Sequence, residues 1–132
     1  MSPLGWSLLL PVALAGGAGA VLRYLVDLGV RRRYAGGPLG IFVVNVTACA
    51  ALGCVAALAA AAWLDDRSGL ILATGFVGGY STLSTVAVDS AQLFRTRRRA
   101  WLALNTVGLF LVSLGVCWLS WSLVSGLPGP TG

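Results

Sequence analysis

The side chains with the most chemical potential in this 132-residue chain lie inside apolar runs and carry no charge. The sequence has no His, Lys or Glu, so the usual participants in acid–base catalysis and metal binding are lacking. The buried polar candidates are amides and hydroxyls, at Asn45, Thr47, Tyr80, Ser81, Thr82, Ser84, Thr85, Asn105, Thr106 and Ser113. Such groups donate hydrogen bonds to an anion without a fixed charge that would trap it. We therefore expect no enzyme, and either anion conduction or simple helix packing.

Asn45 is the first of two candidate pore residues, because it lies in the middle of an apolar run between Val44 and Val46. An amide there must find partners, since unpaired polar groups are costly in lipid. Two interpretations stay open: Asn45 lines a pore, or it bonds to a neighbouring helix. Asn105 is the second candidate, nearer the arginine-rich end of its segment. For the Ser and Thr residues, bonding within and between helices is the commoner use.

The stretch GFVGGYSTLS, at residues 75–84, combines three glycines with a cluster of hydroxyls in an uncharged run. Glycine weakens a helix, so this composition predicts a break in mid-membrane with freed backbone carbonyls. A break is tolerated only where protein or a cavity covers it, and its carbonyls suit a small hard cation such as Na⁺. The alternative is that Gly75 and Gly79, four residues apart, let two helices approach closely. Both interpretations place the stretch at an interface.

Arg23 and Asp27 are spaced as an i,i+4 ion pair near the end of the first apolar run. An intramembrane arginine is usually functional or paired, and this one is close enough to the membrane edge to reach it with its guanidinium. We expect Arg23 to have a structural role or to line a vestibule that attracts anions.

These residues must be positioned by membrane-spanning helices. The chain is 58% hydrophobic and only 10% charged, with a mean hydropathy of +0.88, which is more apolar surface than one soluble core of this size can bury. About 20 apolar residues cross a bilayer as a helix. Four segments qualify, at residues 4–28, 38–64, 70–94 and 100–123. The sequence thus predicts an all-α membrane protein with one domain, residues 1–126, and a disordered tail, residues 127–132.

The arginines predict the orientation of these spans. Seven of the nine lie near the first and third connections: Arg31, Arg32, Arg33, Arg95, Arg97, Arg98 and Arg99. The second connection carries only Arg67, beside two aspartates. Basic residues concentrate on the cytoplasmic side of membrane proteins. We expect connections 29–37 and 95–99 in the cytoplasm, both termini outside, and no nucleic-acid partner, because the arginines flank apolar runs instead of covering one face.

Three stretches together resemble the Fluc/CrcB family of fluoride channels: GGAGAVLRY at 16–24, PLGIFVVN at 38–45, and GFVGGYSTLSTV at 75–86. The resemblance covers most of the chain, and only the fourth span is loosely matched. It implies an antiparallel dimer with two pores in the cell membrane (in bacteria, the inner membrane), which exports fluoride passively and so relieves its toxicity. The arginine of the first motif matches at Arg23.

The resemblance also implies roles for individual residues. Gly78 and Ser81 would supply backbone carbonyls to a structural Na⁺ at the dimer centre, shared with the second subunit. Asn45 would be the pore amide, and Ser84 and Thr85 would lie beside the pore. Fluoride is strongly hydrated, so a channel needs several donors to replace its water, and a buried cation would raise the local anion concentration.

The sequence departs from the family pattern at the pore. The family has phenylalanine at the positions of Leu83 and Val86, where the electropositive ring edge faces the ion. Ile41 replaces a usual threonine. Antiparallel homodimers also need balanced charges, and seven arginines against one are not balanced. We therefore expect a heterodimer with a related chain of opposite bias that supplies the phenylalanines; a homodimer is the alternative.

Two rival functions stay open at this point. A small multidrug exporter has a similar size and four spans, but it uses a glutamate in its first span, and this chain has none. A non-conducting scaffold or partner subunit is the second rival, in which every polar residue serves packing. It predicts no ion flux in any pairing.

Overall fold

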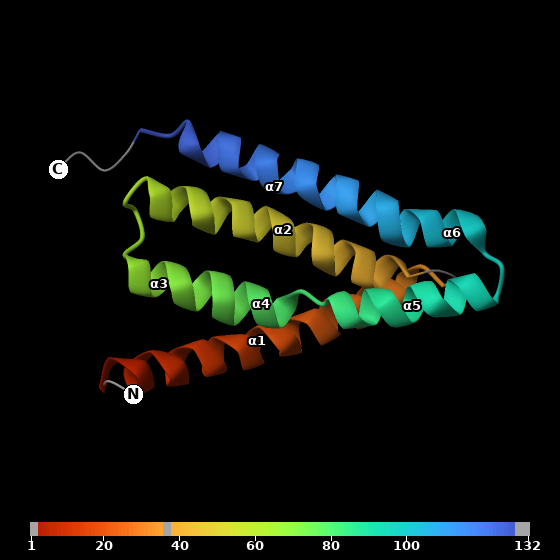
Figure 1. Ribbon diagram of the computed structural model, residues 1–132, viewed down its shortest axis with the longest axis horizontal. Coiled ribbons are helices and arrows are strands. Elements are labelled where there is room, and N and C mark those ends of the chain that lie inside the picture. Colours follow the sequence, from red (N-terminus) through yellow and green to blue (C-terminus); the bar gives the residue numbers. More distant parts are fainter. Residues whose placement is uncertain (1–2, 36–37, 129–132) are drawn as a thin grey trace.

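The computed structural model describes residues 3–35 and 38–128, which form four long helical spans joined by short connections (Figure 1). The first two spans are α1 (Pro3–Arg33) and α2 (Leu39–Ala60). The third consists of α3 (Asp66–Leu70), the π-helix η1 (Ile71–Val77), α4 (Gly78–Tyr80) and α5 (Leu83–Arg95). The fourth consists of α6 (Arg99–Ala103), the π-helix η2 (Leu104–Gly108) and α7 (Leu109–Ser125). All four spans are long and apolar enough to cross a membrane, so the all-helical, four-span prediction is confirmed.

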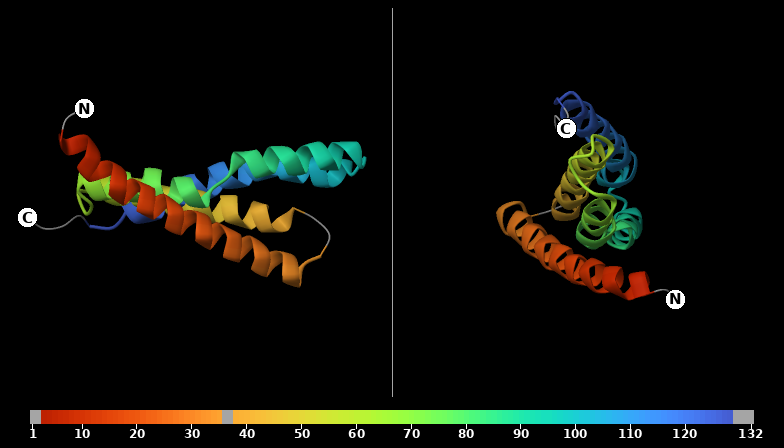
Figure 2. Two further views of the ribbon diagram at one scale, coloured as in Figure 1. Left: turned by 90° about the horizontal axis from the view of Figure 1, so that it is seen from below. Right: turned by 90° about the vertical axis from the view of Figure 1, so that its left-hand side faces the viewer.

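Consecutive spans run antiparallel. The start of α1, the α2–α3 connection and the end of α7 lie at one end of the molecule, and the other two connections lie at the opposite end (Figure 1). Helix α2 packs mainly against α7, and α1 packs against η1 and α4. Figure 2 shows that α1 crosses the other spans at an angle, and that the α5–α6 end stands apart from the start of α2. The predicted sharing of one side by the first and third connections therefore holds.

The ends of the first two spans differ from the prediction. Helix α1 continues to Arg33 instead of ending at residue 28, because Asp27 and Arg31 form an i,i+4 ion pair across its last turns. Helix α2 ends at Ala60 instead of residue 64. Ala62 has a left-handed backbone with a φ of 59°, and the Trp63 N–H bonds back to the Leu58 carbonyl at 2.9 Å, which closes the helix.

The third and fourth spans also begin earlier or end later than predicted. The third begins at Asp66, because the Asp65 carboxylate accepts a hydrogen bond from the Ser68 N–H at 3.3 Å and caps the helix. The fourth runs from Arg99 to Ser125. The predicted disordered tail falls partly on residues 129–132, which lie outside the described residues; Leu127 and Pro128 follow α7 without helical structure.

Most of the large apolar side chains face outward. Leu10, Trp118 and Leu123 are each about two-thirds exposed, as suits a surface in contact with lipid. The buried apolar residues form two small clusters. The first consists of Val44, Ala48, Val77 and Tyr80, and the second of Ile41, Val86 and Leu109. Both clusters lie where the third span meets α2, so this junction is the packed centre of the subunit.

Glycines allow α1 to approach the third span closely. A Cβ added at Gly19 would lie within 2.8 Å of the Tyr80 amide nitrogen, and one at Gly79 would meet the backbone of Gly16. A Cβ added at Gly75 would likewise lie 2.8 Å from the Val12 carbonyl oxygen. The close-approach interpretation of Gly75 and Gly79 is therefore confirmed, and both glycines lie within helical segments and not in the break itself.

Candidate functional site in the broken third span

The third span breaks between α4 and α5, as the sequence predicts. Ser81 and Thr82 have extended backbones, with φ/ψ values of −76°/157° and −152°/124°. The break falls two residues after the last glycine of the motif and splits the span into two helical segments. One therefore ends, and another begins, in the middle of the span.

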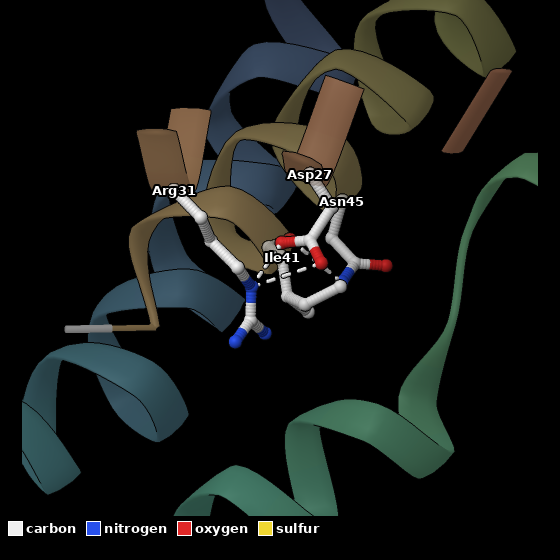
Figure 3. Close-up of polar contacts among 4 residues, drawn as sticks. All are labelled: Asp27, Arg31, Ile41 and Asn45. Carbon is white, nitrogen blue, oxygen red and sulfur yellow. Dashed lines mark hydrogen bonds and ion pairs between the residues drawn. The ribbon is translucent and has the colours of Figure 1, made fainter. Parts of the chain in front are cut away.

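Asn45 holds this break in place. Its side-chain oxygen accepts the Thr82 N–H at 3.0 Å, and its amide nitrogen donates to the Thr82 carbonyl at 3.1 Å. The same nitrogen donates to the Ile41 carbonyl at 3.0 Å. Figure 3 shows the bond to Ile41, with the Asn45 oxygen pointing toward the extended segment. Asn45 thus replaces backbone bonds that the break removes, and both of its N–H groups are used within the chain.

The amide end of α5 carries a cluster of hydroxyls. The Thr82 hydroxyl accepts the Thr85 N–H at 3.4 Å and lies 3.1 Å from the Ser84 hydroxyl and 3.3 Å from that of Thr85. A helix N-terminus has a partial positive charge and attracts anions. Thr82 was among the polar candidates from the sequence, but its role as the N-cap of α5 was not predicted, although threonine is a common N-cap residue.

The carbonyl end of α4 faces the same break. The Thr82 N–H donates to Asn45 and not to the carbonyl of Gly78, its partner in a continuous helix. The Ser81 carbonyl accepts a hydrogen bond from the Arg23 guanidinium at 3.4 Å. The break therefore gathers backbone carbonyls on one side and amides with hydroxyls on the other.

The prediction that Arg23 pairs with Asp27 is wrong. Asp27 instead accepts two bonds from the Arg31 guanidinium, each 2.9 Å long, as Figure 3 shows. Arg23 is directed at the break from α1, so its structural role is to contact the carbonyl end of α4. Spacing alone could not decide between the two arginines, because Asp27 lies four residues from each.

A groove of about 580 Å³ runs beside the break. Its polar lining comes from three spans and consists of Asn45, Ser81, Thr82, Ser90, Asn105, Thr106 and Ser113. Leu83, Val86 and Phe110 are among its apolar residues. The predicted candidates Asn45 and Asn105 are thus brought to one surface. Ser84 and Thr85 are outside the groove lining, in the first turn of α5.

Asn105 is completely buried in the π-helix η2. Its amide nitrogen donates to the Val86 carbonyl at 3.2 Å and to the Ser90 hydroxyl at 2.9 Å. Its side-chain oxygen has no partner among the described residues. The Ser113 hydroxyl, also at the groove, has none there either. Buried polar atoms without a protein partner are where ordered water binds.

Leu83 and Val86, the positions where phenylalanine was expected, have different environments. Leu83 is 81% exposed, whereas Val86 is buried against Ile41 and Leu109. Val86 thus belongs to the subunit's own packing, and Leu83 projects outward at the groove.

The simple packing interpretation is confirmed for two other hydroxyl residues. The Thr106 hydroxyl donates to the Leu102 carbonyl in its own helix at 2.8 Å. Thr47 bonds to the Val43 carbonyl and to the Tyr80 hydroxyl, each at 2.8 Å, and so fixes α4 against α2.

Asp89 and Ser90 were missed by sequence reasoning. Ser90 receives the Asn105 bond, and Asp89 lines a second hollow of about 220 Å³ with Arg31 and Gln92. One carboxylate oxygen of Asp89 is buried without a partner among the described residues. The run VDSAQ at residues 88–92 places a charged residue five positions inside the predicted span end at residue 94, and this signal could have identified the region.

Comparison with known proteins decides the family. The family described as "CrcB-like protein, Camphor Resistance (CrcB)" matches residues 10–121, which include Arg23, Asn45 and the whole of the break. The chain belongs to the CrcB family. Its relatives include "Fluoride-specific ion channel FluC 1" of Leifsonia xyli, 40% identical over 97% of this chain and 95% of the relative. "Fluoride-specific ion channel FluC 3" of Bifidobacterium longum is 43% identical over 80% of this chain and 84% of the relative. "Fluoride-specific ion channel FluC 2" of Rhodococcus jostii is 39% identical over 86% of this chain and 96% of the relative.

Proposed function

We propose that this chain forms a channel that lets fluoride cross the cell membrane passively and so relieves fluoride toxicity. Membership of the CrcB family and the names of its relatives support fluoride as the ion. The observation that carries the proposal is the braced break, which places a helix N-terminus and three hydroxyls in mid-span near a groove with mainly apolar walls. Uncharged donors at a break in a spanning helix suit the passage of an anion.

Each part of the site has a role in this proposal. The N-terminus of α5 and the hydroxyls of Thr82, Ser84 and Thr85 offer hydrogen bonds that replace water around a small anion. Asn45 keeps these donors in position by holding the extended segment, since its own N–H groups are already used. Asn105, across the groove, would hold water through its unpartnered oxygen. Among the described residues, none with a fixed charge lines this groove, so a bound anion can leave again.

The residues present fit a structural Na⁺ at the break. The Gly78 carbonyl lacks its usual helical donor, and the Ser81 carbonyl at the end of α4 has a second lone pair beside the one that accepts the long bond from Arg23. Carbonyls freed by a broken span are good ligands for Na⁺. Two carbonyls from one chain are fewer than a Na⁺ takes, which supports a shared site completed by a second chain. When bound, the cation would raise the local anion concentration near the groove.

We further propose that the channel is an antiparallel dimer. The groove is open in the single chain, and Leu83 projects from it with 81% of its surface exposed. A related partner chain that brings aromatic edges to this surface would complete a pore. The relatives carry the numbers 1, 2 and 3, as in organisms with several such chains, which supports a heterodimer. The arginine bias supports an orientation with the first and third connections in the cytoplasm and both termini outside.

Fluoride efflux from liposomes, followed with a fluoride electrode, tests the proposal. The chain is reconstituted alone and together with a related chain of opposite charge bias from the same organism. We expect fast efflux of fluoride without chloride from the mixed liposomes, and slow or no efflux from the chain alone. Fast fluoride efflux from the chain alone would overturn the heterodimer and keep the channel. No fluoride efflux in either preparation would favour a non-conducting scaffold and overturn the channel.

A further inference from the structure

The turn between α5 and α6 lies at one end of the molecule (Figure 1). A basic hollow adjoins this turn and meets the groove at Thr106, which lines both. The hollow has a volume of about 810 Å³. Three arginines line it, Arg95, Arg97 and Arg99, together with the apolar side chains of Phe94 and Leu102. The arginines come from within five residues of sequence, so the turn concentrates their charge on one spot.

The charge of this hollow is not neutralised within the subunit. Among the described residues, the ion pair joins Arg31 to Asp27, and none joins a carboxylate to Arg95, Arg97 or Arg99. The aspartate nearest in sequence, Asp89, lines the other hollow with Arg31 and not this one, and Asp27 is held by Arg31. A guanidinium without a carboxylate suits phosphate, because its planar fork donates two parallel hydrogen bonds to phosphate oxygens.

The backbone of the turn adds a second, independent observation. Arg97 has a φ of 56°, the left-handed conformation that glycine adopts without strain and other residues adopt at some cost. The Arg97 N–H bonds to the Phe94 carbonyl at 3.2 Å, and the Arg98 N–H bonds to the Leu93 carbonyl at 3.0 Å, so the turn is fixed by the backbone alone. A strained non-glycine residue points to a role for its side chain.

The surroundings of the turn are those of a membrane interface. Phe94 is 73% exposed, at the last turn of a spanning helix. The Arg98 guanidinium lies 5.7 Å from the centre of the Trp101 ring, and tryptophan is enriched at the level of lipid head groups. The hollow therefore has charge at its outer end and apolar side chains toward the membrane core.

We propose that this hollow binds an anionic phospholipid. The phosphate lies among the guanidinium groups of Arg95, Arg97 and Arg99, and an acyl chain follows Phe94 and Leu102 toward the membrane core. The order of charge and apolar surface matches that of a phospholipid, whereas a free phosphate would use only the arginines. Basic hollows beside spans on the cytoplasmic side bind anionic head groups in this way. The inference does not depend on which ion the chain conducts.

Native mass spectrometry of the full-length chain in detergent tests the proposal directly. The protein is mixed with equal amounts of phosphatidylglycerol, cardiolipin and phosphatidylcholine, and the bound lipids are counted. We expect phosphatidylglycerol or cardiolipin adducts in preference to phosphatidylcholine. The double variant Arg97→Gln/Arg99→Gln should weaken this binding roughly thirtyfold, since each basic residue near an anionic head group contributes about fivefold.

The matched control is Arg32→Gln/Arg33→Gln, which removes the same charge from the end of α1, at residues that do not line the hollow. We expect it to change lipid binding by less than threefold. Equal losses in the two double variants would mean that net charge alone attracts the lipid, and would overturn the proposal. The proposal would also be overturned if millimolar inorganic phosphate displaced the bound lipid. It would fail as well if the native protein showed no preference for anionic lipids.

The single variant Arg97→Gly separates folding from lipid binding. Glycine relaxes the left-handed turn, so the thermal midpoint in lipid-free detergent should stay the same or rise. The further rise in midpoint on adding phosphatidylglycerol should fall to less than half of the native value. A full lipid-induced rise in this variant would show that Arg97 has no part in the site.

Discussion

Two asparagines lie on opposite sides of the groove, and their surroundings differ in one respect. Asn45 uses its oxygen and both N–H groups to brace the extended segment at Thr82. Asn105 uses only its N–H groups, and its oxygen is buried without a partner among the described residues. The first is a structural support of the break, and the second leaves an acceptor at the groove. The same residue type can thus use its whole amide to hold the backbone, or leave its oxygen without a protein partner.

The variant with the largest expected effect is Asn45→Leu. It leaves the N–H and carbonyl of Thr82 without their side-chain partner, so the free energy of unfolding should fall by about 2–4 kcal/mol. Thermal unfolding in detergent measures the change. Thr47→Val is the control from the same helix, since it removes a single hydroxyl bonded to Tyr80 and should cost about 1 kcal/mol. Equal effects of the two variants would remove the special role given to Asn45.

The next variant tests whether the contact between α1 and the third span stabilises the break as much as the Asn45 amide does. Gly19→Ala places a Cβ within 2.8 Å of the Tyr80 amide nitrogen and should destabilise the fold by about 2 kcal/mol, because backbone atoms cannot move aside. Gly17→Ala in the same helix has nothing within 4 Å and should be neutral or stabilising by up to about 1 kcal/mol. Paired denaturation curves check this, and a neutral Gly19→Ala would show that α1 is not tightly packed here.

Asn105→Leu tests the second asparagine in the same way as Asn45→Leu tests the first. The change removes two donated hydrogen bonds but also the unpartnered oxygen, so the loss of stability should be only about 1 kcal/mol. Fluoride efflux should fall more than stability does, because the groove loses its polar acceptor. A loss of stability as large as that of Asn45→Leu would mean that the two asparagines stabilise the fold equally, which would contradict the special role of Asn45 in supporting the break.

The smallest effect concerns the helix start outside the membrane, where Asp65 caps α3. Hydrogen bonds from the Ser68 hydroxyl and N–H lower the pKa of the Asp65 carboxyl below its usual value of 3.8. The capping contribution is therefore present above the unfolded pKa and is lost as pH falls through the folded pKa. Thermal midpoints of the native protein and Asp65→Asn, compared from pH 7 to pH 3, should converge at the acid end. A constant difference would show that the charge does not contribute.

Much of this fold could be predicted from hydropathy, because four apolar runs separated by arginines and aspartates admit few arrangements. The break at Ser81 could be placed within a ten-residue stretch, since Gly, Ser and Thr weaken a helix there. Its position within the stretch could not be predicted, because it depends on the bonds between Thr82 and Asn45, thirty-seven residues earlier. Likewise, the choice of Asp27 between Arg23 and Arg31 depends on where α1 meets the break. Such long-range bonds have no local signal in sequence.

The central claim is that fluoride passes at the break that Asn45 braces. The most direct measurement is the initial rate of fluoride efflux from liposomes of the native assembly and of the Asn45→Leu assembly, each confirmed as folded by size-exclusion chromatography. We expect native liposomes to release fluoride but not chloride, and Asn45→Leu to lower the fluoride rate roughly a hundredfold, which corresponds to about 2.7 kcal/mol at the barrier to ion passage. An unchanged fluoride rate in folded Asn45→Leu protein would contradict it.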